Sequence, residues 1–95
     1  MDRHFGSFVW DTQKEAANVR KHGVDFETAA RAFKDPNRKI YTDEKHGEAE
    51  DRLFCLGKVS GRVLTVRFIY REGTIRIYGA GYWRRGRRYY EQADG

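Results

Sequence analysis

Hydrophobic and polar side chains alternate through the second half of the chain, which predicts β-strands there. The alternation covers residues 53–58, 62–70 and 74–79. The segments that join these strands are three residues long and contain Gly61 and Gly73, so consecutive strands must be antiparallel neighbours. The pattern therefore predicts a three-stranded meander.

The alternation also assigns the side chains of these strands to two faces. One face is apolar and takes Leu64, Val66, Phe68, Tyr70, Ile75 and Ile77. The opposite face carries Arg67, Arg76 and Tyr78, with Arg52 as a further candidate. We expect the apolar face to pack against helices and the other face to form an open basic surface.

The first half of the chain carries the signals of a helix start and a helix end. The helix starts at Asp11 or Thr12, and Thr12 with Glu15 has the spacing of a capping box. It ends near His22, because Gly23 suits the left-handed position that follows a helix. A helix is therefore predicted between these two signals.

A short strand at residues 8–10 precedes this helix, and a second helix follows it. The second helix has Asp25 as its cap, and residues 35–37 (Asp-Pro-Asn) end it. Its apolar positions at i, i+3, i+4 and i+7 are Phe26, Ala29, Ala30 and Phe33. One face of this helix is thus expected to pack inward.

The remaining segments are acidic or glycine-rich. Residues 41–51 hold five acidic side chains against one lysine, which predicts a short strand leading into a mobile loop. The Gly-Ala-Gly sequence at 79–81 predicts a flexible elbow before a last helix at about residues 82–92, in which Gly86 costs about 1 kcal/mol relative to alanine. Because the chain has 95 residues and neither repeats nor linkers, we expect one α+β domain over residues 1–95.

The net positive charge lies in the last third of the chain. Residues 1–60 hold equal numbers of basic and acidic side chains, whereas residues 61–95 hold eight arginines, no lysine and three acids. Arginine grips phosphate bidentately and stacks on flat rings. Residues 81–90 interleave arginines with aromatic side chains, a pattern that favours single-stranded nucleic acid as partner. A solvated basic helix with an aromatic core stripe is the alternative.

Several classes of protein are disfavoured. The sequence shows neither an apolar run of membrane-spanning length nor a signal-peptide pattern, so we expect a cytoplasmic protein without a membrane partner. His4, His22 and His46 are far apart and lack partners at ligand spacing, so we expect no metal and no cofactor. Cys55 lies in an apolar run and is expected to be a small core residue.

Two clusters of side chains contain candidate catalytic residues. Arg20, Lys21 and His22 lie at a predicted helix end, where the helix dipole favours cations; plain helix capping is the alternative. The second cluster is the arginine face with the closing aromatic helix. RNA cleavage without metal needs a base for the 2′-hydroxyl proton, a cation for the phosphorane and an acid for the leaving 5′-oxygen. The chain contains side chains suited to each task.

An ordered series of short motifs resembles the BrnT family of type II toxins. The series is Trp10-Asp11, Lys21-His22-Gly23-Val24-Asp25-Phe26 with Ala29, Phe33-Lys34-Asp35-Pro36, Glu50-Asp51-Arg52, Leu56-Gly57, Tyr70-Arg71-Glu72-Gly73, Ile75-Arg76-Ile77, and Arg87-Arg88 with Tyr90-Glu91. The match spans nearly the whole chain. One departure is that the family's common Ser-Ala-Arg ending is Gly79-Ala80-Gly81 here, so an arginine is missing at Gly81, and Arg84 is the candidate to replace it.

The resemblance implies a RelE-like fold in which an antiparallel sheet is packed by two N-terminal helices and a short C-terminal helix. It implies ribosome-independent RNA cleavage that stops translation. It also implies a BrnA-like antitoxin with a DNA-binding domain, so that RNA and antitoxin are direct partners, a toxin–antitoxin hetero-oligomer is an expected assembly, and operator DNA is bound only through the antitoxin.

The leading hypothesis is therefore a metal-independent endoribonuclease toxin. Its candidate catalytic residues are Lys21, His22, Arg52, Arg76 and Arg84. Its candidate RNA-binding residues are Arg67, Arg71, Tyr78, Tyr82, Trp83, Arg87 and Arg88. One alternative is a non-catalytic RNA- or antitoxin-binding module that acts as a transcriptional co-repressor. Another is a structural subunit whose aromatic helix packs against a partner chain.

Overall fold

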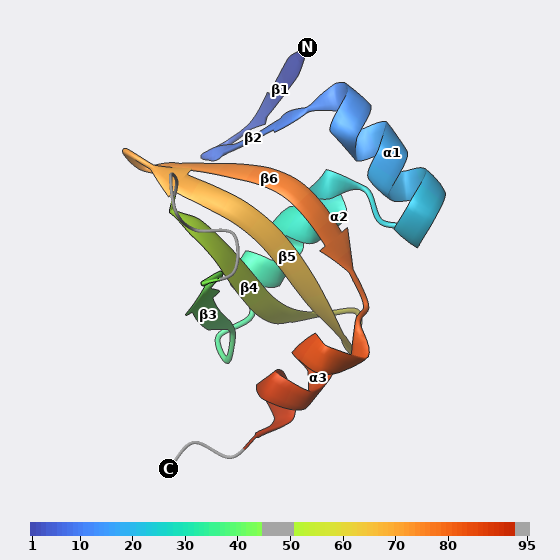
Figure 1. Ribbon diagram of the computed structural model, residues 1–95, viewed down its shortest axis with the longest axis vertical. Coiled ribbons are helices and arrows are strands. Elements are labelled where there is room, and N and C mark those ends of the chain that lie inside the picture. Colours follow the sequence, from blue (N-terminus) through green and yellow to red (C-terminus); the bar gives the residue numbers. More distant parts are fainter. Residues whose placement is uncertain (45–50, 93–95) are drawn as a thin grey trace.

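The computed structural model describes residues 1–44 and 51–92, and within them it contains one six-stranded sheet and three α-helices (Figure 1). The sheet order is β1-β2-β6-β5-β4-β3. The strands are β1 Asp2–Phe5, β2 Phe8–Asp11, β3 Lys39–Thr42, β4 Arg52–Val59, β5 Arg62–Arg71 and β6 Thr74–Gly81. The helices are α1 Thr12–His22, α2 Phe26–Arg31 and α3 Arg84–Glu91, with a 3-10 turn η1 at Ala32–Lys34 after α2.

The predicted meander is confirmed, because β4, β5 and β6 pair as consecutive antiparallel strands. Both of its turns have two residues with positive φ, Ser60 and Gly61 in the first and Glu72 and Gly73 in the second. This is the turn type whose twist matches that of the flanking strands, and it needs a glycine at the second position. The α+β class is confirmed as well. The acidic loop predicted after β3 lies largely outside the described residues.

The sheet is mixed, so the expectation of an antiparallel sheet was wrong. β2 pairs in parallel with β6, with Phe8 opposite Ile75, and the Ile75 amide donates to the Ser7 carbonyl over 2.9 Å. β1 was not predicted, because all four of its residues are exposed and show no apolar alternation. Local periodicity cannot reveal a partner that lies more than sixty residues away.

The Gly-Ala-Gly segment is the end of β6, so the predicted elbow was also wrong. Gly81 pairs with Thr65 and Gly79 with Arg67, and α3 starts only at Arg84. A Cβ at Gly79 would lie 3.5 Å from Cδ of Arg67, and a Cβ at Gly81 would overlap the Trp83 indole. Gly81 therefore makes room for the indole, whereas the space at Gly79 would admit a Cβ at ordinary van der Waals distance. Both glycines are paired strand residues and do not form a hinge.

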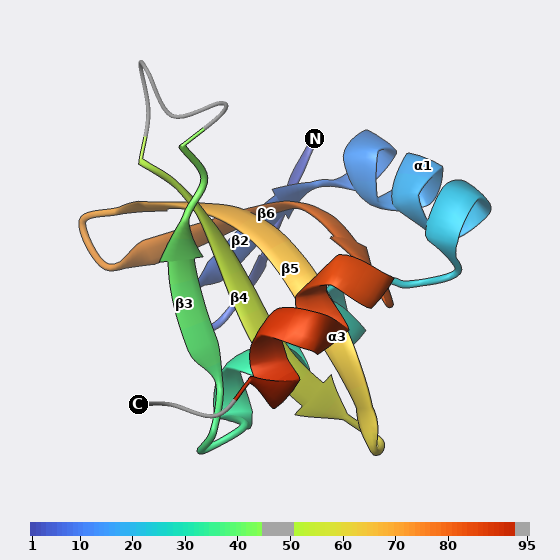
Figure 2. The ribbon, with the colours of Figure 1, turned by 60° about the horizontal axis from the view of Figure 1, so that its bottom comes forward.

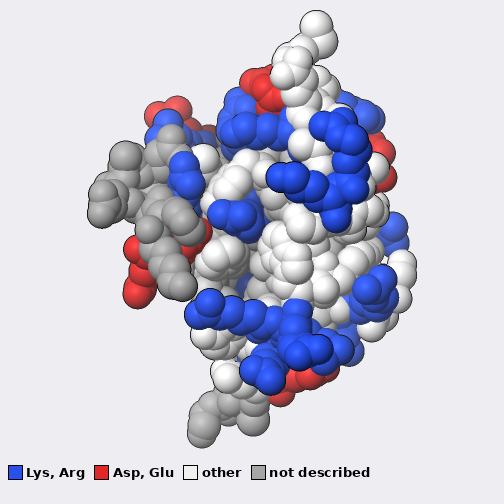
Figure 3. All heavy atoms as spheres, turned by 45° about the vertical axis from the view of Figure 1, so that its right-hand side comes forward, with Lys and Arg blue, Asp and Glu red and all other residues white. Residues whose placement is uncertain are grey.

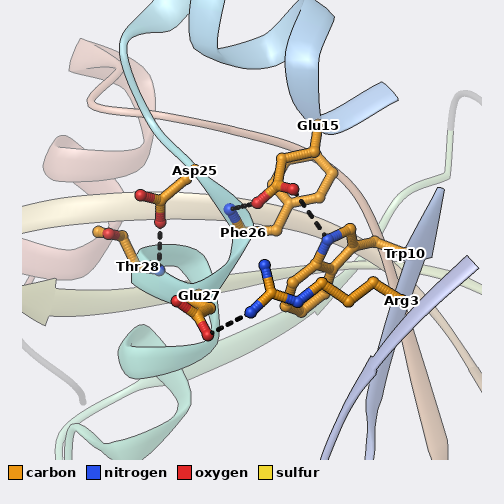
Figure 4. A network of polar contacts seen from close by, with 7 residues as sticks. All are labelled: Arg3, Trp10, Glu15, Asp25, Phe26, Glu27 and Thr28. Carbon is orange, nitrogen blue, oxygen red and sulfur yellow. Dashed lines mark hydrogen bonds and ion pairs between the residues drawn. The ribbon is translucent and has the colours of Figure 1, made fainter. Parts of the chain in front are cut away.

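Helix α1 begins at Asp11, whose carboxylate accepts hydrogen bonds from the amides of Gln13 and Lys14. The predicted capping box was wrong, because the Glu15 carboxylate accepts instead from the Trp10 indole over 3.1 Å and from the Phe26 amide over 2.9 Å. Glu15 thus links β2, α1 and the start of α2 (Figure 4). The helix ends as expected, with the residue after it, Gly23, at φ 69°.

A shell of polar contacts surrounds the fully buried Trp10 (Figure 4). The Arg3 guanidinium lies 5.7 Å from the Trp10 ring centroid and forms an ion pair with Glu27 at 2.9 Å. The expected cap Asp25 is confirmed, since its carboxylate accepts from the Thr28 amide. The N-terminal strand is thereby held against the start of α2.

The two faces of the sheet are covered by different helices. Helix α2 lies behind the sheet and α3 crosses in front of β4 and β5 (Figures 1 and 2). The predicted apolar face is confirmed at Leu64, Val66 and Phe68, which are buried. Tyr70 is 47% exposed, because it lies near the end of the long β5–β6 hairpin.

Helix α3 covers part of the face that was predicted to be open. Gly86 lies so close to β5 that a Cβ there would overlap Oγ1 of Thr65, and Thr65 is only 4% exposed. A glycine that weakens the isolated helix thus permits the helix to approach the sheet closely. The basic surface that remains open lies on the part of the sheet beyond α3.

The far end of α3 is held by Asp35 and Lys39. The Asp35 carboxylate accepts from the Tyr90 hydroxyl over 2.6 Å and from the Lys58 amide over 2.7 Å. The Lys39 ammonium donates to the carbonyls of Tyr89 and Gln92, which satisfies groups that a helix end leaves unpaired. These contacts tie the helix to the segment after η1 and to β3.

The Asp35–Tyr90 contact changes the pKa of both groups. The hydrogen bond to Asp35, with burial, raises the pKa of Tyr90 from 10.0 to about 12. Burial acts to raise the pKa of Asp35, but the hydrogen bonds from Lys58 and Tyr90 outweigh it, so this pKa lies below its ordinary value.

We predict that Tyr90→Phe lowers the free energy of unfolding by about 1 kcal/mol near neutral pH. The loss should shrink above pH 10.0, because tyrosine then ionises in the unfolded chain before it does so in the folded one. It should also shrink in acid, as the pH falls through the lowered pKa of Asp35. Urea titrations of both proteins across the pH range measure this, and a difference independent of pH would contradict it.

We also predict that Gly86→Ala destabilises the protein by about 1–3 kcal/mol, because the new methyl group overlaps Thr65 and lifts α3 from the sheet. Helix propensity alone gives the opposite sign, a gain of about 1 kcal/mol. Thermal unfolding distinguishes the two. Adding Thr65→Ala to the variant should restore part of the loss, and simple additivity of the two changes would argue against this contact.

Candidate functional site

Two arginines and a tyrosine converge on the open part of the sheet. The Arg52 and Arg67 guanidinium carbons lie 5.5 and 5.2 Å from the ring centroid of Tyr78. The three residues come from β4, β5 and β6, so the antiparallel pairing of the meander brings them together. We call Arg52, Arg67 and Tyr78 the arginine–tyrosine cluster.

The cluster contains polar atoms that the protein leaves unused. Three buried side-chain atoms among the described residues lack a hydrogen-bond partner: Nε of Arg67, the hydroxyl of Tyr78, and Oγ1 of Thr65 beneath α3. Buried polar groups are nearly always satisfied, so two such atoms in one cluster make the cluster a candidate binding site. Two guanidinium groups lie beside these atoms, so an anion is the kind of ligand that the cluster favours.

A β-bulge accounts for the position of Tyr78. Arg67 pairs with Gly79, whereas the next residue, Phe68, pairs with Ile77, which leaves Tyr78 as an extra residue in β6. Bulges re-aim a side chain and are common beside active sites. Alternation placed Tyr78 on the correct face but gave no signal of the bulge.

A second group of candidate residues lies further along β6. The His22 and Trp83 rings meet edge to face, with their centroids 5.2 Å apart, and the indole covers Gly81. Trp83 therefore occupies the space that a side chain at position 81 would take. The Arg67 side chain lies beside Gly79 and the Trp83 indole lies over Gly81. Two residues along a strand span about 7 Å, which is the distance between these two places on β6.

Asn18 holds this arrangement together, and the sequence analysis missed it. Its side-chain amide donates to the carbonyls of Val24 and Ala80 and accepts from the Ala80 amide, at 2.9 to 3.1 Å. The side chain thus pairs with β6 as a neighbouring strand would, beyond the point where β2 ends. The sequence offered no signal for this role, because the burial of Asn18 is evident only in the structure.

The arginines of α3 lie on two flanks of the helix. Arg84 and Arg87 line a groove of about 470 Å³ between α3 and the β4–β5 hairpin, together with Tyr82 and Trp83. On the other flank, a second depression is lined by Arg84, Arg85, Arg88, Tyr89 and Gln92. Figure 3 shows basic side chains gathered over α1 and over α3, with uncharged surface between them.

Other predicted site residues are not part of these groups. Arg76 forms a bidentate ion pair with Asp2, at 2.8 and 3.1 Å, and this hydrogen bonding lowers the pKa of Asp2. Arg71 lies exposed at the end of the β5–β6 hairpin, and Lys21 is exposed near the end of α1.

A reactive thiol and a metal-binding group of side chains are two further kinds of site to consider. Cys55 is fully buried, as predicted, and burial raises the pKa of its thiol to about 12, so it stays protonated. In residues 1–44 and 51–92, no three His, Cys, Asp or Glu side chains gather in a way that suits a metal ion. His46 lies outside the described residues.

One family of known proteins matches the sequence of this chain. Within the part of the chain that is described, no helix is long and apolar enough to cross a membrane. A search of curated proteins finds no match. The sequence pattern of one family, described as "Ribonuclease toxin, BrnT, of type II toxin-antitoxin system", matches residues 10–86. Because the match covers most of the chain, the protein belongs to the BrnT family of type II toxin–antitoxin ribonuclease toxins.

Proposed function

We propose that this chain is an endoribonuclease toxin that cleaves RNA without the ribosome and without a metal ion, and so stops translation. The observation that carries the proposal is the arginine–tyrosine cluster, where two guanidinium groups flank one ring and buried donors lack partners. Membership of a ribonuclease toxin family supports RNA as the anion that this cluster receives. A RelE-like ancestry belongs to the same proposal.

The proposed reaction is an internal transfer at phosphorus. The 2′-oxygen of one nucleotide bonds to the adjacent phosphorus, and the bond from phosphorus to the 5′-oxygen breaks. A base takes the 2′-hydroxyl proton, and an acid gives a proton to the leaving 5′-oxygen. The products are a 2′,3′-cyclic phosphate and a 5′-hydroxyl.

In this proposal Arg52 and Arg67 stabilise the charge of the phosphorane, and the Tyr78 hydroxyl donates to one of its oxygens. His22 and Lys21 are the proton-transfer candidates. His22 is the stronger of the two, because its ring packs against Trp83, whose indole covers Gly81, two residues along β6 from Gly79 and the Arg67 side chain. Trp83 then offers a ring on which a base stacks. Tyr82 is the weaker stacking candidate, because the Arg62 guanidinium carbon already lies 3.9 Å from its ring centroid.

The remaining candidates have more peripheral roles. Arg84, Arg87 and Arg88 lie exposed on α3 and are proposed to hold phosphates on either side of the scissile one. Arg71 would contact RNA at the hairpin end. Arg76 is the catalytic candidate that the geometry supports least, because Asp2 already occupies its guanidinium.

A type II toxin has an antitoxin protein as partner, and we propose a BrnA-like one that forms a hetero-oligomer with this chain in the cytoplasm. The basic surface beside exposed aromatic rings suits an acidic or amphipathic antitoxin segment. Bound there, the segment would block RNA and link the toxin to operator DNA through its own DNA-binding domain.

The second candidate function is a non-catalytic RNA- or antitoxin-binding module that acts as a co-repressor. Gly81 favours this alternative, because the arginine that the motif resemblance predicts there is absent and the Trp83 indole covers the position. Growth arrest on induction distinguishes a toxin from such a module.

We predict that Arg67→Ala lowers the rate of RNA cleavage about a hundredfold or more, because a charge donor to the transition state is lost. Arg31→Ala is the matched control, since Arg31 is an exposed arginine on α2, behind the sheet. Cleavage of a labelled RNA by both variants, with melting curves to verify folding, tests this. Equal cleavage rates for the Arg67→Ala and Arg31→Ala variants would show that Arg67 does not take part in catalysis.

We further predict that the purified protein cuts a long unstructured RNA in the presence of EDTA and leaves 2′,3′-cyclic phosphate ends. Mapping of the new ends, with and without ribosomes, measures this. Cleavage only on ribosomes, or only with added metal, would refute the corresponding part of the proposal. Intact RNA that stays tightly bound would favour the binding module.

A further inference from the structure

Helix α3 divides the basic surface into two sides. Gly86 and Tyr90 face the sheet, as their contacts with Thr65 and Asp35 show. With about 3.6 residues per turn, successive side chains are about 100° apart, so Arg87 points to one flank, Arg85 and Tyr89 to the other, and Arg88 away from the sheet. Arg85, Arg88 and Tyr89 border the second depression, whereas Arg87 borders the groove beside the β4–β5 hairpin.

This groove has a floor and walls from three parts of the chain. It encloses about 470 Å³, which falls within the range of small-molecule sites. The hairpin supplies Lys58 and Arg62, and the segment leading into α3 supplies Tyr82 and Trp83. Helix α3 contributes the side chains of its Arg87 flank. The proposed mechanism makes no use of Lys58 or Arg62.

The most telling contact in the groove is a stacked arginine. The Arg62 guanidinium carbon lies 3.9 Å from the centroid of the Tyr82 ring, which fixes the planar group against an aromatic wall. Within the described residues, neither Arg62 nor Arg87 forms an ion pair with a carboxylate. Glu91 is the one acidic side chain among the described residues that line the groove. The groove is therefore strongly cationic, with its guanidinium held in place.

We propose that this groove is a second phosphate-binding subsite for RNA, separate from the arginine–tyrosine cluster, so that a bound strand crosses α3. The inference rests on the proposed function, since it assumes that RNA occupies the cluster. Arg84 lines both depressions and lies where the strand passes over the helix. Arg62 and Lys58 would grip a phosphate several nucleotides away from the cleaved bond.

The lining favours RNA over an acidic peptide helix. An amphipathic helix needs an apolar groove for its hydrophobic side. Here Val63 is the only aliphatic side chain among the described lining residues, and apart from Gly61 and Glu91 the rest of the lining is cationic or aromatic. Proteins bind single-stranded nucleic acid in grooves that combine positive charge with aromatic rings. The lining of this groove has both.

The test measures the binding of 2′-O-methyl oligonucleotides, which lack the attacking hydroxyl and stay intact. A tetranucleotide and a dodecanucleotide are titrated by fluorescence anisotropy against wild type, Arg62→Ala and the control Arg31→Ala. Wild type should bind the longer strand more tightly. Arg62→Ala should weaken dodecanucleotide binding about tenfold, should weaken tetranucleotide binding much less, and should reduce the slope of log affinity against log salt by about one. Arg31→Ala should match wild type.

Three results would overturn the proposal. Unchanged dodecanucleotide affinity in Arg62→Ala would show that RNA does not enter the groove. An equal loss of affinity for the tetranucleotide and the dodecanucleotide would show that the groove belongs to the cleavage centre. Lost antitoxin affinity with unchanged RNA affinity would make it a protein-binding groove. If Arg62→Ala unfolds, Arg62→Gln keeps a planar group over Tyr82 without the charge. A wild-type protein that binds no RNA would refute the proposed function itself.

Discussion

The distance between α3 and the sheet controls which basic side chains face each other. Gly86 against Thr65 allows the helix backbone to lie directly on β5, and Asp35 and Lys39 hold its far end. A helix that lay further out would cover less of the sheet and would separate the arginines of α3 from those of β4 and β5. The open part of the sheet, and with it the arginine–tyrosine cluster, is defined by the place where α3 crosses.

Much of the fold could be predicted from the sequence because it depends on local signals. Alternation identified β4, β5 and β6, and glycines at positive φ marked the turns and the end of α1. The errors concern contacts between distant segments. The parallel pairing of β2 with β6 and the burial of Thr65 under α3 depend on tertiary packing, which periodicity does not encode.

The candidate site was predicted unevenly for the same reason. Residue type and strand face brought Arg52, Arg67 and Tyr78 into consideration, and the structure brings them together. Arg76 fulfilled the same criteria but is paired with Asp2 from the N-terminal strand, whose presence the sequence did not indicate. Asn18 was overlooked because a single buried amide on a polar helix is visible only once its partner, the backbone of Ala80, is placed.

The indole of Trp83 occupies the space that any side chain at position 81 would need. Positions 81 and 83 are thus coupled by space: a large residue at 81 demands a small residue or a different rotamer at 83. An arginine at 81 would have to displace the indole, and with it the edge-to-face contact between Trp83 and His22. A substitution at 81 therefore also changes the surroundings of the histidine, although the two residues are distant in the sequence.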